Sequence, residues 1–380
     1  MKKVLLVVPM STTAFGSKNA GGVDSVCQML VEQLASVGST EFCYRIVAFD
    51  PFNSGKTETT PVKLSDNVEF VFFSSKEKVF GLPVPGLISC NIRVMQQVAE
   101  FKPDIIHSHI GAWILGGVKV SHRIVTLHAY STVGRNPKSF FNNVLYERLV
   151  PNLTDMVVTE YSVVGRLLLD TLKRDTKKNV QIVANPIATA FFNIQREHVE
   201  GQRLRFVTCA LLTSRKRIDV SIRLLKRVKT LGIDAELVII GPGTDQGYVG
   251  ELKALVDSEC LTEFVQFAGA CSRPEILKYY QSAQLGLFFS IEETFGLAPL
   301  EMIAAGLPVI TSKVGVLAER YDEFSQLPSV FVSDKLDVDL LANRVCEMVS
   351  ADTAVAKKFI SSEYSVSRVI ECYESMYRRT

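Results

Sequence analysis

Short apolar runs alternate with stretches of helical hydrophobic spacing, and this alternation limits the fold more than any other feature of the chain. The run at 4–8 is followed by Val26, Leu30 and Leu34, which recur at helical spacing and end near Gly38. An alternation of this kind is typical of an α/β fold, in which helices cover a parallel sheet. Further strands are predicted at 44–49, 68–73, 105–107, 123–127, 156–159 and 180–183.

A polar stretch at 195–203, shortly after Asn185 and Pro186, separates this series from a second one. The second series is predicted to contain strands at 204–209, 235–240, 265–267, 285–289, 309–311 and 330–332, and helices at 220–230, 251–258, 275–282 and 297–305. A chain of 380 residues is long for a single core. We therefore predict two Rossmann-like parallel-sheet domains, 1–194 and 195–361, with a C-terminal helix near 362–380 that packs back on the first domain. The carboxyl ends of two facing sheets would surround an interdomain cleft, where such sheets bind ligands.

The charge balance argues against a nucleic acid partner, because 42 Lys and Arg residues face 40 Asp and Glu residues. Eight cysteines are scattered without a Cys-x-x-Cys pair, which is typical of free thiols in a reducing cytoplasm. No stretch reaches the roughly 20 apolar residues of a membrane span. We expect a cytoplasmic protein, with peripheral contact at the inner face of the membrane left open. The basic, aromatic stretch 135–148 suits such contact, although aromatic residues at helical spacing usually face a core.

The stretch 290–311 marks the point where a strand ends and a helix begins. Pro299 suits the first helical turn, Gly306 suits the residue after the last turn, and Pro308 prevents the helix from continuing. Unpaired N–H groups at such a helix start can hold phosphate. Gly296 would let a ligand approach the backbone closely.

Two carboxylates flank this helix start. Glu293 lies in the loop and Glu301 in the first turns of the helix, so both can accept hydrogen bonds from the hydroxyls of one elongated ligand. Sugars offer many such hydroxyls. The alternative is that Glu301 only complements the helix dipole and that Glu293 is a solvated loop residue.

The wider motif carries a family resemblance. Glu, seven residues and Glu, with Phe-Gly-Leu inside and Ala-x-Gly-x-Pro-Val after, resembles the signature of retaining glycosyltransferases of family 4, the glycosyl transferases group 1. Similar matches lie at 21–23, 103–109, 125–128, 182–186, 212–219, 237–243 and 267–269, so the resemblance covers nearly the whole chain. It implies the GT-B fold, in which two Rossmann-like domains face a cleft.

The resemblance implies three catalytic residues. Glu293 would contact hydroxyls of the donor sugar, and Lys216 would neutralise the diphosphate as the leaving group gains negative charge. His128 would lie near the donor sugar and its phosphate. Taken without the resemblance, Lys216 is equally well part of a solvated basic turn, and His128 a satisfied polar residue at a strand end.

The resemblance also implies a donor-binding set and a loop near the N-terminus. Glu301 would hold the ribose, and backbone N–H groups near Phe295 would meet the sugar and its phosphate. The predicted donor-binding residues are Thr294, Phe295, Gly296, Leu297, Glu301, Arg215, Arg217, Gly241 and Gly243. Gly21 and Gly22, otherwise a tight turn, are predicted to form a phosphate or acceptor loop.

The chain departs from the family pattern at one place. The family often has Gly-Arg-Leu at this point, five residues before the lysine, whereas this chain has Ala210-Leu211-Leu212. The usual second phosphate-binding arginine is therefore missing from the sequence. Arg215 or Arg217 would take its role with a different geometry, because an arginine fork and a lysine ammonium bind phosphate differently.

The acidic pair Asp337 and Asp339 is similar to the metal-binding pair of other glycosyltransferases. Its place beside Leu336 and Leu340 favours a helix cap instead, and no obligatory metal is predicted.

The resulting hypothesis is a metal-independent, retaining hexosyltransferase. It would move a sugar from a UDP- or GDP-sugar to a hydroxyl of a glycan or lipid-linked glycan, in cell-surface polysaccharide or glycoconjugate synthesis. The alternatives are a sugar phosphorylase or nucleotide-sugar epimerase of the same fold, and a catalytically silent binding protein that keeps the fold.

Overall fold

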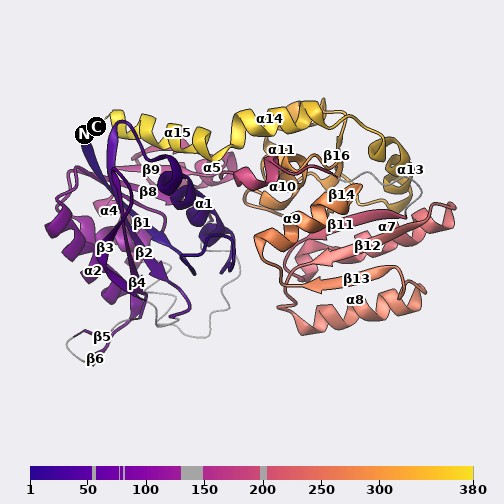
Figure 1. The fold of residues 1–380 in the computed structure, drawn as a ribbon, viewed down its shortest axis with the longest axis horizontal. Coiled ribbons are helices and arrows are strands. Elements are labelled where there is room, and N and C mark those ends of the chain that lie inside the picture. The colour runs from indigo at the N-terminus through magenta and orange to yellow at the C-terminus, as the bar shows by residue number, and fades with distance from the viewer. Residues whose placement is uncertain (54–56, 77, 80–81, 130–148, 197–202, 380) are drawn as a thin grey trace. The chain divides into compact units, whose positions relative to one another are not determined.

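The computed structural model describes residues 1–53, 57–76, 78–79, 82–129, 149–196 and 203–379, and the chain forms two compact units (Figure 1). Unit 1 comprises Met1–Pro186 and Val366–Thr380, and unit 2 comprises Ile187–Ser365. Each unit contains a mostly or wholly parallel sheet with helices around it, as the alternating pattern of the sequence predicts.

Unit 1 is built on an eight-stranded sheet with the order β10-β9-β8-β7-β1-β2-β4-β3. Its central strand β1 pairs in parallel with β2 and β7, which places Leu5 beside Arg45 on one side and Ile106 on the other. Only the edge strand β3 runs antiparallel to its neighbour. The strands are β1 (Lys2–Pro9), β2 (Phe42–Asp50), β3 (Glu58–Ser65), β4 (Val68–Ser74), β7 (Ile105–Ser108), β8 (His122–Leu127), β9 (Glu160–Val163) and β10 (Asn179–Ile182), and β5 (Lys78–Val79) pairs separately with β6 (Leu82–Pro83).

The first helix follows the predicted periodicity. In α1, Val26, Leu30 and Leu34 are buried, and Gly38 ends the helix with a φ of 69° and an N–H that donates to the Leu34 carbonyl oxygen. Within its described residues, the helices of unit 1 are α1 (Gly22–Val37), α2 (Gly86–Phe101), the 3₁₀ helix η1 (Gly111–Gly117), α4 (Val150–Val157), α5 (Arg166–Asp175) and α15 (Val366–Arg378).

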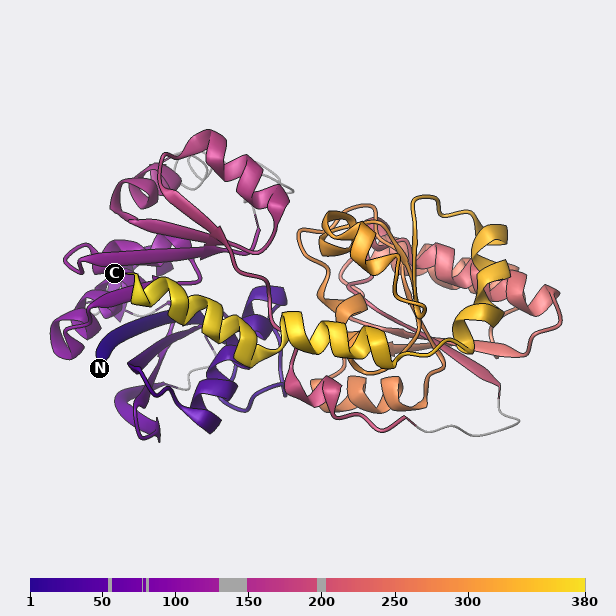
Figure 2. The ribbon, with the colours of Figure 1, turned by 90° about the horizontal axis from the view of Figure 1, so that it is seen from above.

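The C-terminal helix α15 belongs to unit 1, and Figure 2 shows it running beside β1 toward the N-terminus. Lys2 Nζ donates to the carbonyl oxygen of Tyr377, and Glu374 accepts hydrogen bonds from Ser39 and Tyr44. In the segment where a C-terminal helix was predicted, near 362–380, α15 thus packs on the sheet domain of unit 1.

Unit 2 is built on a six-stranded, wholly parallel sheet with the order β13-β12-β11-β14-β15-β16. Its strands are β11 (Leu204–Cys209), β12 (Ala235–Ile240), β13 (Val265–Gly269), β14 (Leu285–Phe288), β15 (Val309–Ser312) and β16 (Val330–Ser333). Its helices are α6 (Thr189–Phe192), η3 (Ser214–Lys216), α7 (Ile218–Thr230), α8 (Gln246–Ser258), α9 (Arg273–Ser282), α10 (Leu297–Ala304), α11 (Val316–Glu319), α12 (Tyr321–Phe324), α13 (Val338–Val349) and α14 (Ala354–Tyr364). Apolar residues of α7, α8 and α13 form one core with the strands.

Two sequence predictions differ from the structure. The strand predicted at 156–159 is wrong, because Pro151 starts the helix α4, Met156 lies in that helix, and the strand β9 begins only at Glu160. The units meet along the chain at Pro186 and not at 194. Ile187 N–H donates to the carbonyl oxygen of Tyr364 at 2.7 Å, which keeps the following residues in unit 2.

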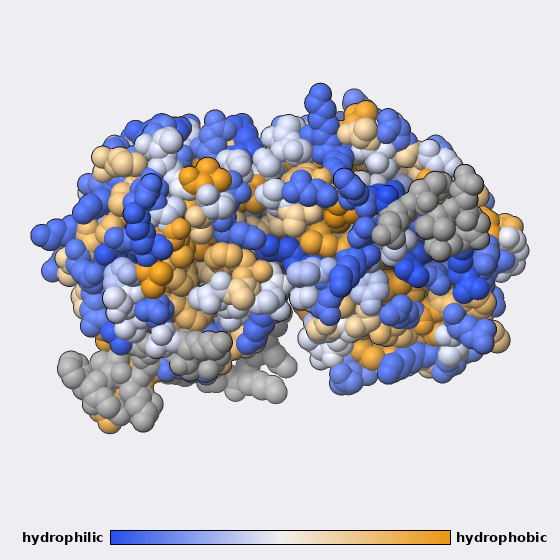
Figure 3. Space-filling model, viewed as in Figure 1, coloured by the Kyte–Doolittle hydropathy of each residue, from blue (hydrophilic) through white to orange (hydrophobic). Residues whose placement is uncertain are grey.

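The predicted cap on α13 is confirmed, since Asp337 accepts hydrogen bonds from the N–H groups of Asp339 and Leu340. Among the residues that the structure describes, no three His, Cys, Asp or Glu side chains gather as metal ligands. Within the same residues, no helix is both long and apolar enough to cross a membrane. The predicted membrane-contact stretch 135–148 lies entirely outside the described residues. On the face drawn in Figure 3, hydrophilic and apolar residues are interspersed over both units.

Candidate functional site

The loop that joins β14 to α10 carries Glu293 and is anchored by hydrogen bonds. Ser290 N–H donates to the Ser312 hydroxyl at 2.9 Å, and that hydroxyl donates to the Ser290 carbonyl oxygen at 2.9 Å. Ile291 N–H donates to the carbonyl oxygen of Arg215 at 2.9 Å. Since β11 and β14 are neighbours in the sheet, the loops that follow them lie side by side at the carboxyl ends of the strands.

Two glycines shape this loop. Gly296, at the start of α10, has a φ of 91°, a left-handed conformation that favours glycine. Gly315 has a φ of 54°, and a β-carbon there would lie 2.2 Å from the carbonyl oxygen of Phe295. Val316 N–H donates to the same carbonyl at 2.9 Å. The backbone around Gly315 therefore lies directly behind the loop that presents Glu293.

Lys216 and Glu293, the first two predicted catalytic residues, form an ion pair. Their side chains are only 12% and 13% exposed, so each charge depends on the other for neutralisation. The Lys216 ammonium also lies 5.4 Å from the centroid of the Phe288 ring. The structure thus brings together two residues that are far apart in the sequence.

Glu301 extends from α10 in a poorly solvated environment. Burial raises the pKa of its carboxyl to about 7, and the positive charge of Arg273 opposes that rise. Burial also raises the pKa of the Cys209 thiol to about 12, with a contribution from the negative charge of Glu301. Glu301 is therefore placed among the end of β11, the start of α9 and the first turns of α10.

The remaining residues of the predicted donor loop differ in exposure. Phe295 is buried, and its ring packs edge-on against Tyr364 with centroids 6.0 Å apart. Its ring is therefore not available to a ligand, which leaves the backbone N–H as the predicted contact. Thr294 and Leu297 are partly buried at the surface of the same loop.

Gly241 and Gly243 lie after β12 and serve close backbone approach. Gly241 has a φ of 142°, and a β-carbon on it would lie 1.8 Å from the carbonyl oxygen of Ala210. Its N–H donates to the carbonyl oxygen of Gly269 at 2.8 Å. A β-carbon on Gly243 would lie 2.8 Å from Val249. Gly241 therefore joins the ends of β12 and β13, and Gly243 lets the start of α8 pack closely against the loop after β12.

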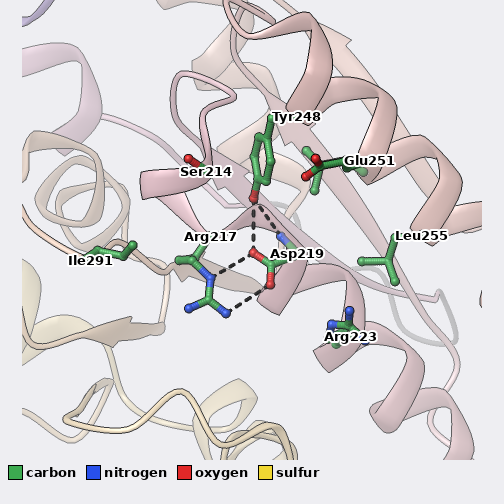
Figure 4. A pocket seen from close by; sticks show the side chains of 9 residues that line it. Ser214, Arg217, Asp219, Arg223, Tyr248, Glu251, Leu255 and Ile291 are labelled. Atoms are coloured by element: carbon green, nitrogen blue, oxygen red, sulfur yellow. Dashed lines mark hydrogen bonds and ion pairs between the residues drawn. The ribbon is translucent and has the colours of Figure 1, made fainter. Parts of the chain in front are cut away.

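Arg215 and Arg217 have different surroundings. Arg215 is half-exposed and lies 3.5 Å from Glu292. Arg217 instead donates two hydrogen bonds of 3.1 Å to Asp219. Its side chain lines a cavity of about 420 Å³ between η3, α7 and α8, together with Tyr248 and others shown in Figure 4.

In unit 1, Gly21 and Gly22 are exposed at the start of α1, and a β-carbon on either would meet no atom within 4 Å. The loop before them is organised by the buried carboxylate of Asp24. That carboxylate accepts hydrogen bonds from the N–H and hydroxyl of Ser11 and from the N–H of Ala20. Open space around the two glycines is compatible with a ligand close to this loop.

His128 is buried in unit 1, with both ring nitrogens hydrogen-bonded there. Nδ1 lies 3.0 Å from Asn185 Oδ1, and Nε2 lies 2.9 Å from His109 Nδ1. The amide oxygen can only accept, so His128 carries its proton on Nδ1 and accepts from His109. Burial lowers the pKa of His128 to about 4 and holds that of His109 well below its usual value.

His107 continues this array of buried imidazoles. Its ring lies 4.8 Å from that of His109, and its nitrogens are hydrogen-bonded to the hydroxyls of Tyr377 at 2.6 Å and Thr126 at 2.7 Å. Burial lowers its pKa to about 3. The array is therefore neutral at physiological pH.

Each unit contains supporting residues, close to the predicted site residues, that the sequence analysis missed. Ser290, Ser312 and Gly315 fix the loop that carries Glu293, and Asp24 fixes the loop before Gly21. In the sequence, the only signal for Ser290 and Ser312 was their place at predicted strand ends. Their pairing follows from the adjacency of β14 and β15.

The sequence and the fold of this chain are similar to those of known glycosyltransferases. The family model for glycosyl transferases group 1 matches residues 191–364. The D-inositol 3-phosphate glycosyltransferase of Pseudarthrobacter chlorophenolicus is 23% identical over 330 residues, which are 80% of this chain and 76% of that protein. Two solved structures align over the whole chain. Sucrose-phosphate synthase from Thermosynechococcus elongatus aligns over 99% of its length, with a TM-score of 0.71 and 15% identity. Anabaena HepE, solved with UDP-glucose, aligns over 100% of its length, with a TM-score of 0.69 and 14% identity.

The two parallel-sheet units, the anchored acidic loop at the start of α10 and these matches define a nucleotide-sugar-dependent glycosyltransferase with the GT-B fold. More narrowly, unit 2 matches the glycosyl transferases group 1 model, since the match at 191–364 covers nearly all of that unit.

Proposed function

We propose that this protein transfers a sugar from a nucleoside-diphosphate sugar to a hydroxyl of a glycan or lipid-linked glycan, with retention of the anomeric configuration. The observation that carries the proposal is the ion pair of Lys216 and Glu293 beside the start of α10. A cation, a carboxylate and unpaired N–H groups at one helix start provide what a sugar diphosphate requires.

In this proposal Lys216 faces the diphosphate. When the bond between the anomeric carbon and the phosphate oxygen breaks, negative charge grows on the leaving group, and the ammonium stabilises it. Glu293 would then exchange part of its contact with Lys216 for hydroxyls of the donor sugar. Glu301 would accept hydrogen bonds from the ribose hydroxyls.

Arg215 is the better candidate for the missing phosphate-binding arginine. Its guanidinium is half-exposed and its ion pair with Glu292 is long, at 3.5 Å, whereas Arg217 is engaged twice by Asp219. An exposed pair of this kind is worth little and is readily exchanged for a phosphate.

The donor is proposed to be a UDP- or GDP-sugar. Binding of UDP-glucose by Anabaena HepE supports a uridine nucleotide, and its low identity to this chain leaves guanosine to be tested alongside. The acceptor is proposed to be an intermediate of cell-surface polysaccharide or glycoconjugate synthesis. The protein is proposed to act in the cytoplasm, with peripheral contact to the membrane. The inositol phosphate acceptor named for the Pseudarthrobacter relative supports a polyhydroxylated acceptor.

Calorimetric titration with UDP and GDP tests the donor site. We expect one of them to bind the native protein, and Glu293→Ala to abolish sugar transfer in a donor screen read by mass spectrometry. Asp339→Ala, which removes an exposed carboxylate on α13, is the matched control and should retain transfer. Lack of binding by both nucleotides, or full transfer by Glu293→Ala, would contradict the proposal.

Incubation with donor alone separates the alternatives predicted from the sequence. An epimerase would change the donor sugar without an acceptor, and a phosphorylase would require inorganic phosphate. A transferase consumes the donor productively only when an acceptor hydroxyl is added. A silent binding protein would bind nucleotide and transfer nothing from any donor.

A further inference from the structure

Arg217 has a backbone conformation that is unusual for its residue type. It lies between η3 and α7 with φ and ψ both 44°, in the left-handed region that disfavours residues with a β-carbon. It directly follows Lys216. A non-glycine residue in this conformation persists only where its surroundings hold it there.

The side chain of Arg217 is held by Asp219, which is anchored in turn by Tyr248. Its Nε and Nη2 each donate to a carboxylate oxygen of Asp219 at 3.1 Å. The Tyr248 hydroxyl donates to Asp219 Oδ1 at 3.2 Å and accepts from the Asp219 N–H at 3.3 Å (Figure 4). Tyr248 is 7% exposed and belongs to α8, so the carboxylate is anchored to a second helix.

The cavity beside these residues shows what keeps Arg217 in place. Ser214, Tyr248 and Leu255 line it with the guanidinium, and its volume is about 420 Å³. The guanidinium therefore has room to move, and its side chain is 37% exposed. The paired hydrogen bonds with Asp219, rather than tight packing, hold it.

The turn at Arg217 determines where Lys216 points. Lys216 N–H donates to the Thr213 carbonyl oxygen and Arg217 N–H to that of Ser214, which closes the turn of η3. From the end of this turn the Lys216 side chain reaches Glu293 and the Phe288 ring. A lysine has a long, flexible side chain, so the direction of its Cα–Cβ bond limits where the ammonium can lie.

We propose that Arg217, Asp219 and Tyr248 form a positioning clamp for Lys216. The clamp residues do not act on the donor themselves. They hold a left-handed turn that aims the ammonium at the diphosphate, and the inference rests on the proposed function of Lys216. Arg217 is thereby reassigned from a phosphate ligand to a positioning residue.

The test compares the affinity of a nucleoside diphosphate with that of its nucleoside, using UDP with uridine and GDP with guanosine. The ratio used is the dissociation constant of the nucleoside divided by that of the nucleoside diphosphate. It isolates the contribution of the diphosphate, which Lys216 would contact. General damage to unit 2 would weaken the binding of both ligands to the same extent and leave this ratio unchanged. We expect Asp219→Ala to lower the ratio about tenfold, as a misplaced charged group would.

Two backgrounds make the mechanism specific. In Lys216→Ala the ratio falls, and adding Asp219→Ala should lower it no further, because the clamp acts through the lysine. Adding Arg217→Gly to Asp219→Ala should restore most of the ratio, since glycine adopts a positive φ without a clamp. Tyr248→Phe keeps the ring packing and should lower the ratio less than Asp219→Ala does.

Each outcome decides one claim. An unchanged ratio in Asp219→Ala, or a further loss in the Lys216→Ala background, overturns the clamp while leaving the donor site intact. An unchanged ratio in Lys216→Ala itself overturns the proposed role of the lysine. Asp339→Ala on α13 should keep the native ratio and controls for loss of a helix-start carboxylate.

Discussion

At the scale of single residues, Glu301 combines a binding role with an unusual proton affinity. Burial raises the pKa of its carboxyl to about 7, whereas an exposed glutamate is ionised well below that pH. An ionised carboxylate is the stronger acceptor for ribose hydroxyls. The burial of this carboxyl group therefore makes its charge, and with it its strength as an acceptor, depend on pH in the neutral range.

We predict that nucleoside affinity rises between pH 6 and pH 8. Below pH 7 Glu301 must lose a proton to bind as a carboxylate, which reduces affinity by at most about tenfold per pH unit. Glu301→Gln should bind more weakly and with little pH dependence. Calorimetry with uridine or guanosine, which lack titrating phosphates, measures this directly. A native affinity that stays flat across this range would contradict the proposed ribose contact.

Arg215, unlike Arg217, is proposed to contact the diphosphate directly, and its substitution should affect binding accordingly. We predict that Arg215→Ala weakens nucleoside diphosphate binding by roughly tenfold, because a charge-assisted contact to phosphate is lost. Nucleoside binding should not change, since Arg215 would touch only the diphosphate. Titration of UDP and uridine into both proteins distinguishes the two effects. Equal weakening of both ligands would instead indicate that the loop anchored at Arg215 has moved.

At the scale of elements, strands and helices were predictable where hydrophobic periodicity was long or flanked by clear stop signals. The predicted strand at 204–209 coincides with β11, and the predicted strand at 235–240 coincides with β12. The short apolar run at 156–158 was ambiguous between helix and strand, and Pro151 decided for the helix. The sequence motifs also pointed to Glu293, Glu301 and Lys216, and the structure brings Glu293 and Lys216 together.

The supports of the site could not be predicted in the same way. The contact of Ser290 with Ser312 depends on β14 and β15 being neighbours, and the left-handed turn at Arg217 is held by Tyr248 from a separate helix. Such contacts join segments that only the sheet order brings together. A single sequence gives residue types and local spacing, which do not fix that order.

The loop before α10 offers a test at this scale. In Gly315→Ala, the new β-carbon would lie 2.2 Å from the carbonyl oxygen of Phe295 and 3.1 Å from Glu293 Cβ. We predict a loss of stability of about 1–3 kcal/mol, because the strained φ and the clash both have to be relieved. Transfer should fall more than stability suggests, as Glu293 shifts with its loop. Gly250→Ala, at a position with open space, is the control for thermal unfolding and transfer.

At the scale of the whole molecule, the two units contain buried groups whose pKa values are shifted in opposite directions. In unit 1, burial keeps His107 and His128 neutral, with pKa values of about 3 and 4. These histidines take up protons near pH 6.5 once unfolded, so their contribution to stability is present above that pH and is lost as the pH falls. In unit 2, Glu301 has a raised pKa of about 7. Its contribution is present below the unfolded value near 4.5 and is lost as the pH rises to 7.

We therefore predict that acidification from pH 7.5 to pH 5 lowers the unfolding temperature of unit 1 and raises that of unit 2. The range is informative because the carboxylates with lowered pKa, such as Glu275 and Glu323, lose their contribution only below about pH 4.5. Differential scanning calorimetry should resolve the transitions, since two-domain chains need not unfold in one step. Glu301→Gln identifies the transition of unit 2, because it should remove the pH-dependent change of that unfolding temperature. His107→Gln should reduce the corresponding change for unit 1. Shifts of both transitions in the same direction would show that other groups control the stability of the two units in this range.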